Sequence, residues 1–150
     1  MDKKQAALER LDSLENEAKE LRKIINAPDK PKSIMERVKT FEDICLIEGT
    51  TVADFQAQCD NKIDSKDERA YKKLKLIAKV LNEGWKPDWS NGNENKYYPY
   101  FRMSGFGFSA TYCGWARTGT TGGSRLCFKT RELAEYAGKQ FEMIYKDYLL

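Results

Sequence analysis

Histidine is absent from the 150 residues of the chain. Its absence excludes His-dependent triads, His-based acid–base catalysis and His metal ligands. Cysteine is scarce, and Cys45, Cys59, Cys113 and Cys127 form no C-x-x-C pair of the kind that zinc sites use. We interpret them as reduced, small apolar residues, with Cys113 and Cys127 the one pair that a hairpin would bring together. The sequence therefore predicts no metal and no cofactor.

A long hydrophobic run is also missing. No window approaches the roughly 20 apolar residues of a membrane span, and the N-terminus lacks the apolar core of a secretion signal. The net charge of +3, from 26 basic and 23 acidic residues, gives no large global attraction to nucleic acid or membrane. We predict a cytoplasmic chain without membrane partners.

Catalytic patterns are weak as well. Carboxylate pairs and cysteine nucleophiles remain available without histidine, but no spacing singles any of them out. We therefore expect a protein that is not an enzyme.

Residues 3–27 contain no glycine, and Pro28 and Pro31 follow them, which predicts one long helix. Its apolar residues repeat in heptads. In a parallel two-stranded coil, Arg10 would meet Glu15 and Glu17 would meet Arg22 of the other chain. The pattern favours a parallel homo-oligomer, although the helix could instead pack on its own domain or stand alone. The predicted contact residues are Leu11, Leu14, Ala18, Leu21 and Ile25.

The remaining chain reads first as helical. Capping boxes at Ser33–Glu36 and Ser65–Glu68 predict a helix ending at Gly49 and another over 66–82. A short helix is predicted from Thr51 to Cys59. The 66–82 helix places four cations on one arc, which is either a phosphate-binding face or an ordinary solvated face. These cations are Arg69, Lys72, Lys75 and Lys79.

From Trp85 onward, glycine, asparagine and aromatic residues replace lysine, glutamate and leucine. Strands are predicted over 96–103, 106–115 and 124–129, and Thr130 would cap a last helix that ends at Tyr148. The predicted fold class is therefore α+β. It comprises a coiled-coil-like helix (1–27), a Pro spacer (28–32) and a compact domain (33–150) in which a C-terminal helix packs on a three-stranded antiparallel sheet.

The segment 105–109, Gly-Phe-Gly-Phe-Ser, is similar to the RNP1 motif of RNA-recognition domains. The order of elements does not fit that βαββαβ fold, so we reject the family. Alternation still puts Phe106 and Phe108 on one sheet face, and Tyr98 and Tyr100 on one face of the neighbouring strand. These aromatics are either core or interface residues, or a surface on which bases stack.

Taken together, residues 6–11, 32–38, 81–89, 97–101 and 123–129 resemble a group of small proteins found in phages and mobile elements of gut bacteria. The resemblance implies no activity, cofactor or binding residue. It implies a phage-type accessory protein, present in the cytoplasm of a bacterial host or in the virion.

Two functions follow from these observations. The first is an oligomerising interaction module with an unknown protein partner. The second is a nucleic-acid-binding accessory protein that uses the basic helix face and the strand aromatics. Residues 85–150 hold nine Lys/Arg and six Asp/Glu, so the positive excess lies with the aromatics.

Overall fold

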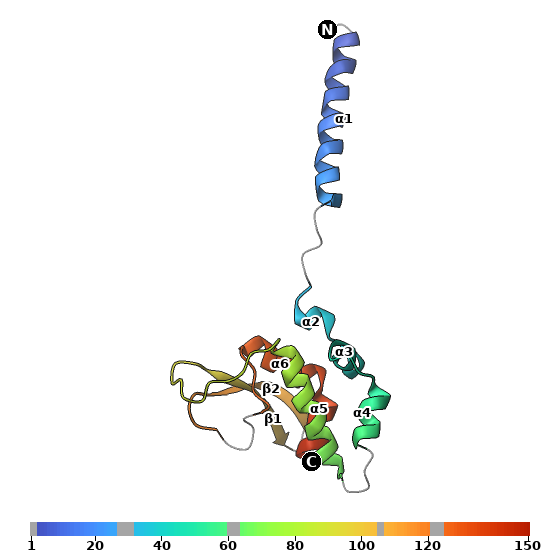
Figure 1. Cartoon of the computed structure of the whole chain (residues 1–150). Coiled ribbons are helices and arrows are strands. Elements are labelled where there is room, and N and C mark those ends of the chain that lie inside the picture. The colour runs from blue at the N-terminus through green and yellow to red at the C-terminus, as the bar shows by residue number, and fades with distance from the viewer. Residues whose placement is uncertain (1–2, 27–31, 60–63, 105–106, 121–124) are drawn as a thin grey trace. The chain divides into compact units, whose positions relative to one another are not determined.

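The computed structural model describes residues 3–26, 32–59, 64–104, 107–120 and 125–150, and within them the side chains of all residues except 24, 26, 104 and 107–111. The chain divides into two compact units, Met1–Pro31 and Lys32–Leu150 (Figure 1). Each unit is described by itself.

The first unit holds one helix, α1 (Lys3–Asn26), as the sequence predicted. All of its described side chains are exposed, including the apolar ones. Leu11, Leu14 and Leu21 are 53%, 49% and 54% exposed, and Ile25 is 77% exposed. Nothing within the described part of this unit covers the apolar stripe.

The second unit begins with short helices. Ser33 caps α2 (Ile34–Arg37) through the predicted capping box. The prediction of a single helix from 33 to Gly49 is wrong, because Thr40 starts a second capping box with Asp43 and opens α3 (Phe41–Ile47). The Thr40 hydroxyl accepts the Asp43 N–H, which satisfies a donor that a continuous helix would have used internally.

The next two helices follow the sequence prediction closely. They are α4 (Val52–Cys59) and α5 (Lys66–Leu81). Gly84, with a φ of +86°, lies just beyond the end of α5 in the left-handed conformation that ends helices. The inner face of α5 is fully buried at Leu74, Ile77 and Leu81.

The sheet is an antiparallel hairpin of β1 (Lys96–Ser104) and β2 (Gly107–Ala116). Tyr98 pairs with Gly114 and Tyr100 with Tyr112, and the register shifts between Tyr100 and Phe101. A bulge of this kind bends the strand and redirects the side chains that follow. The α+β class is found, but with two strands in the described residues.

The predicted third strand, over 124–129, is wrong. Tyr97 and Phe128 form an isolated bridge, with Tyr97 N–H donating to the Phe128 carbonyl (3.0 Å) and Phe128 N–H to the Tyr97 carbonyl (2.8 Å). The next hydrogen-bonded pair along this register would need an N–H from Pro99, which has none.

The Asn82 side chain forms hydrogen bonds with the backbone of the residues on either side of Phe128. Its amide donates to the Cys127 carbonyl (2.9 Å), and its carbonyl oxygen accepts the Lys129 N–H (3.0 Å). The Asn82 side chain thus binds the edge of the segment that faces away from β1.

The C-terminal helix predicted from Arg131 to Tyr148 is two helices, α6 (Arg131–Gln140) and α7 (Glu142–Leu149). Thr130 caps α6 as expected, and its hydroxyl accepts the Leu133 N–H. The break lies at Phe141, whose φ of −114° and ψ of 28° leave the helical region while its ring is buried.

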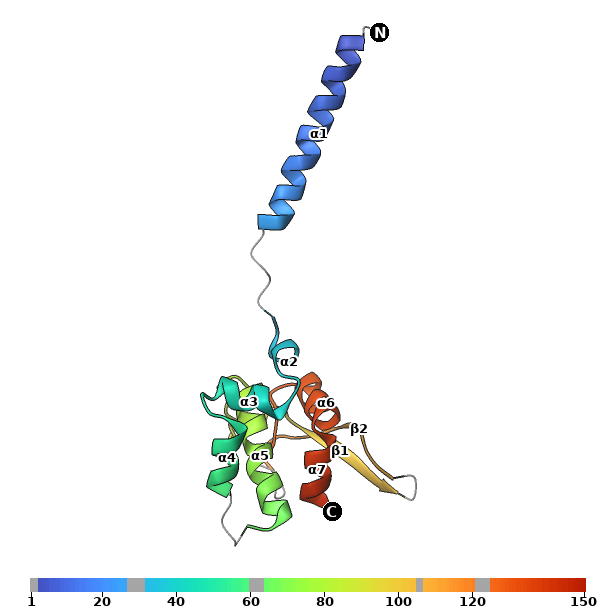
Figure 2. The same cartoon turned by 90° about the vertical axis from the view of Figure 1, so that its right-hand side faces the viewer.

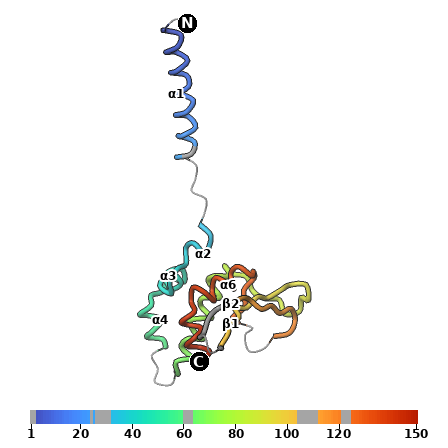
Figure 3. The backbone as a smooth tube through the Cα atoms, turned by 180° about the vertical axis from the view of Figure 1, so that it is seen from behind, coloured from blue at the N-terminus to red at the C-terminus, as the bar shows by residue number. Residues whose placement is uncertain are grey.

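One core joins these elements. α6 packs on both strands, and α7 packs along α5, as Figure 2 shows. Phe128 and Ile77 are fully buried in this core together with Val38 from the end of α2. Seen from behind, the C-terminus lies beside β1 (Figure 3). The candidate site lies where the end of α7 approaches β1.

Candidate functional site

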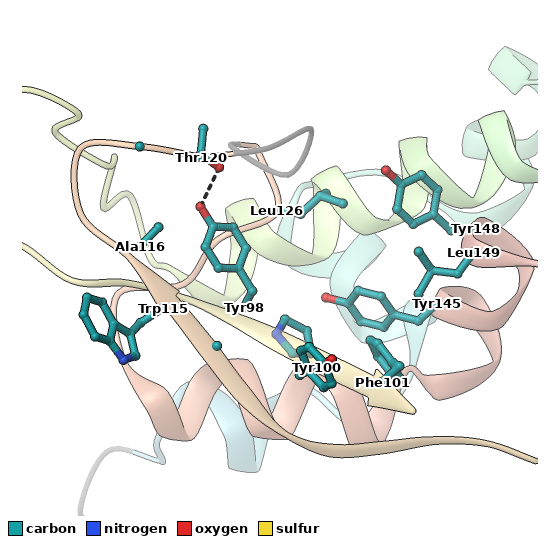
Figure 4. Close-up of a pocket in the computed structure, with 13 residues that line it drawn as sticks. Tyr98, Tyr100, Phe101, Trp115, Ala116, Thr120, Leu126, Tyr145, Tyr148 and Leu149 are labelled. Carbon is teal, nitrogen blue, oxygen red and sulfur yellow. Dashed lines mark hydrogen bonds between the residues drawn. The ribbon is translucent and has the colours of Figure 1, made fainter. Parts of the chain in front are cut away.

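An open cavity of about 720 Å³ lies where β1, the segment after β2 and the end of α7 meet (Figure 4). That volume falls within the roughly 300–1,000 Å³ of ligand pockets. We call this cavity the aromatic groove. Aromatic rings line it from both sides, namely Tyr98, Tyr100, Phe101, Trp115, Tyr145 and Tyr148.

Ring contacts hold these aromatic side chains in place. Phe101 of β1 packs on Tyr145 of α7 with 4.8 Å between ring centroids. Tyr100 stacks on Tyr112 across the hairpin at 4.4 Å, and Tyr148 stacks on Tyr71 of α5 at 5.6 Å. Such contacts limit ring motion, so the groove walls are organised before any ligand arrives.

The polar groups of the groove are hydroxyls. Those of Tyr98 and Thr120 are hydrogen-bonded at 2.9 Å, as the dashed line in Figure 4 marks. Burial raises the pKa of Tyr98, so this phenol stays neutral. The hydrogen bond between Tyr98 and Thr120 links β1 to the segment after β2.

Tyr145 presents the second polar feature of the groove. Its side chain is only 4% exposed, and its hydroxyl points from α7 into the groove (Figure 4). Within the described part of the chain, this hydroxyl has no hydrogen-bond partner. Burial alone raises the Tyr145 pKa, so the hydroxyl remains a protonated donor. No enclosed side-chain polar atom of the described chain lacks a hydrogen-bond partner, so the Tyr145 hydroxyl opens into the groove, where a ligand can reach it.

No lining residue in the described part of the chain is charged. Besides the aromatics, the groove is lined by Pro99, Gly114, Ala116, Gly119, Leu126 and Leu149, together with Thr120. The described lining of the groove is therefore an uncharged surface that offers hydroxyl groups.

The structure brings together some of the aromatics that the sequence singled out. Tyr98 and Tyr100 both line the groove. Phe106 lies outside the described residues, as does the side chain of Phe108. The predicted shared face of these two phenylalanines therefore stays a prediction.

Other groove residues were not identified from sequence. Tyr145 and Tyr148 lie in the predicted C-terminal helix, and Trp115 and Leu126 lie in predicted strands. Tyr145 is buried, and helical periodicity does not reveal where a hydroxyl at the tip of a buried ring ends up. Only the packing of α7 against β1 shows that.

Three of the four cations on the basic face of α5 contact other described side chains of the chain. Lys72 is paired with Asp64, and Lys79 with Glu48 of the segment after α3. The Lys75 ammonium lies 5.2 Å from the centroid of the Tyr71 ring. Of the four predicted phosphate contacts, Arg69 has no acidic partner among the described ion pairs. Two of the four charges are thus compensated within the chain.

The four cysteines are buried, and none of them forms a disulfide. Burial raises the pKa of the Cys45 and Cys113 thiols, and that of Cys127 to about 11. A buried thiol with a raised pKa is a poor nucleophile. The described residues also contain no group of acidic, cysteine or histidine side chains placed to hold a metal ion.

Comparison with known proteins found no matching family model, no matching curated protein and no matching solved structure. Among the described residues, no helix has the length and apolar character that crossing a membrane requires.

Proposed function

We propose that the protein is a non-enzymatic interaction protein that self-associates through α1. The observation that carries this proposal is the apolar stripe of α1, whose leucines are half exposed within their own unit. From the resemblance noted above, we further propose a phage-type accessory role in the cytoplasm of a bacterial host.

The spacing of the stripe supports a coiled coil. Leu11, Ala18 and Ile25 are seven residues apart, as are Leu14 and Leu21, so they form the a and d positions of a heptad. Burying one such leucine contributes about 1.5–3 kcal/mol. A 24-residue helix that leaves this stripe in water gains stability from a second copy.

Charges beside the stripe favour the parallel arrangement. In a parallel pair, Arg10 meets Glu15 of the partner and Glu17 meets Arg22. In the fully overlapping antiparallel pair, Glu15 would face its own copy and so would Glu17. Like charges at these positions disfavour the antiparallel arrangement.

Nucleic-acid binding is the second candidate in the sequence, but the observations favour it less. Lys72 and Lys79 are compensated by carboxylates, and no cation among the described residues lines the groove to receive a phosphate. Phosphate contacts would produce a strong dependence of binding on salt. Salt-sensitive binding of single-stranded DNA or RNA would therefore favour this alternative.

The test is the double variant Leu14→Glu/Leu21→Glu, studied by sedimentation equilibrium. We expect the natural chain to sediment as an oligomer and the variant as a monomer, because two carboxylates cannot be buried in the seam. A natural chain that is monomeric at all concentrations would refute the proposal.

The matched control is Ser13→Glu/Asn16→Glu, which adds the same two charges outside the seam and should leave the oligomer intact. Charge reversal tests the orientation. Glu15→Arg should weaken association, and adding Arg10→Glu to it should restore the attraction in a parallel pair.

A further inference from the structure

We propose that the aromatic groove binds an uncharged, proline-rich segment of a partner protein in the extended polyproline II conformation. This inference goes beyond self-association and does not depend on it. It rests on three properties of the groove, namely its rings, its hydrogen-bond donors and its lack of charge.

The rings supply the apolar surface that such a segment requires. Tyr100 and Trp115 are 48% and 56% exposed, whereas Phe101 and Tyr145 close the far side of the groove. Polyproline II segments dock in aromatic-lined grooves because their ridged shape fits between rings, and because they lose little conformational entropy on binding. The ring contacts that hold Tyr100 and Tyr148 keep this surface pre-organised.

The hydroxyls define the polar match. The Tyr145 hydroxyl points into the groove as a donor without a partner in the described chain, so a ligand that satisfies it must bring an acceptor. A polyproline II segment has free carbonyls, since the conformation contains no internal hydrogen bonds. Proline also lacks an N–H, so the ligand buries no donor that the groove cannot satisfy.

The lack of charge selects among ligands. A nucleic-acid strand would bring phosphates to a surface with no lining cation among the described residues. A sugar would bring many hydroxyl donors, whereas the groove side chains offer only hydroxyl oxygens as acceptors. A neutral segment rich in acceptors and poor in donors fits best.

The test is isothermal titration of the full chain with an uncharged oligoproline of about ten residues, long enough for three polyproline II turns. A glycine–serine peptide of equal length is the comparison. We expect the oligoproline to bind and the glycine–serine peptide not to bind. Equal binding of both peptides, or no heat with oligoproline at millimolar concentration, would overturn the proposal.

Tyr145→Phe tests the donor itself. It keeps the ring against Phe101 and removes only the hydroxyl, so affinity for oligoproline should fall about threefold to tenfold, the value of one hydrogen bond. The melting temperature of the free variant should stay nearly the same, because the hydroxyl opens into the groove and makes no hydrogen bond to the described chain. A lower melting temperature, or unchanged affinity, would contradict the proposed role.

Tyr97→Phe is the matched control, since it removes a hydroxyl from the same strand outside the groove. The Tyr97 hydroxyl accepts from the Asn95 amide at 3.3 Å. Affinity for oligoproline should be unchanged in this variant. If single-stranded oligothymidylate displaced the oligoproline, the groove would be assigned to nucleic acid instead and the proposal would fail.

Discussion

At the scale of single residues, the Asp43 carboxylate makes the stability of the α3 N-terminus depend on pH. Its carboxylate accepts the Lys39 and Thr40 N–H groups, both at 2.8 Å, and the Thr40 hydroxyl at 3.0 Å. These hydrogen bonds favour the charged form and lower the Asp43 pKa below its ordinary value of 3.8. The folded state therefore binds fewer protons than the unfolded state near this pH.

The sign of the effect follows directly. Stability from the Asp43 cap is present above the unfolded pKa near 3.8 and is lost as the pH falls through the lower folded pKa. We predict that Asp43→Asn lowers stability at neutral pH and makes its decline below about pH 4 shallower. Urea unfolding at pH 7, 4 and 3 measures both effects.

Glu42→Gln is the control, because it removes the same charge one residue away and leaves the cap hydrogen bonds in place. An unchanged acid slope in Asp43→Asn would contradict the prediction.

Residue-level features were predictable where they are local. Ser33 and Thr130 cap helices through contacts three residues along the chain, and such patterns are readable in the sequence. The structural role of Asn82 could not be predicted, because its hydrogen-bond partners Cys127 and Lys129 lie 45 and 47 residues away. Nothing in the local sequence distinguishes a buried asparagine of this kind from an exposed helix end.

At the scale of elements, Lys96 organises the loop between α5 and β1. It is fully buried, and its ammonium donates to the carbonyls of Asp88, Asn91 and Glu94. It also pairs with the Glu94 carboxylate at 3.1 Å and lies 5.3 Å from the Trp89 ring centroid. One buried side chain thus binds three carbonyls of the irregular loop, and those of Asp88 and Asn91 also accept backbone N–H groups.

We predict that Lys96→Met lowers the free energy of unfolding by about 1–3 kcal/mol, because it removes the hydrogen bonds and the ion pair of a buried ammonium. Amide hydrogen exchange should rise mainly in the 86–95 loop. Chemical denaturation and exchange mass spectrometry measure the two effects.

Lys86→Met, at an exposed position in the same loop, should change stability by less than about 0.5 kcal/mol. Equal losses in both variants would show that the buried ammonium has no special role.

The elements themselves were partly predictable. Long helices such as α1 and α5 follow from periodicity and from their end signals. The third strand was predicted because residues 124–129 have strand-like composition, yet pairing depends on the neighbouring chain. Pro99 lacks the N–H that the next hydrogen-bonded pair with β1 would need. Asn82 binds the Cys127 carbonyl on the opposite edge of the segment.

At the scale of the whole molecule, the core belongs to one unit. Among the side chains that the structure describes, every buried core residue lies between Ile34 and Tyr145, and none lies in α1. A unit that contains its own core should fold without the preceding helix.

We predict that a chain shortened to Lys32–Leu150 unfolds in one cooperative transition, with the same melting temperature as the monomeric Leu14→Glu/Leu21→Glu variant. Differential scanning calorimetry measures this. A shortened chain without a cooperative transition would mean that α1 contributes to the core.

The aromatic groove also belongs to this scale. Tyr98 and Tyr100 were identified from strand alternation, but Leu126, Tyr145 and Tyr148 join them through the packing of distant segments. A sequence pattern shows which face of a helix is apolar. It does not show that the face ends at an opening, which depends on the relative placement of β1 and α7.

Pro99 has one more consequence, which concerns aggregation. A coiled coil through α1 would hold several C-terminal units at high effective concentration, and an open strand edge at such concentration invites sheet-to-sheet fusion between copies. Pro99 interrupts the row of donors on the outer side of β1, where only Tyr97 makes the isolated bridge. In such an assembly, the proline that removes a donor from this edge of β1 would also keep the edges of neighbouring copies from pairing with it.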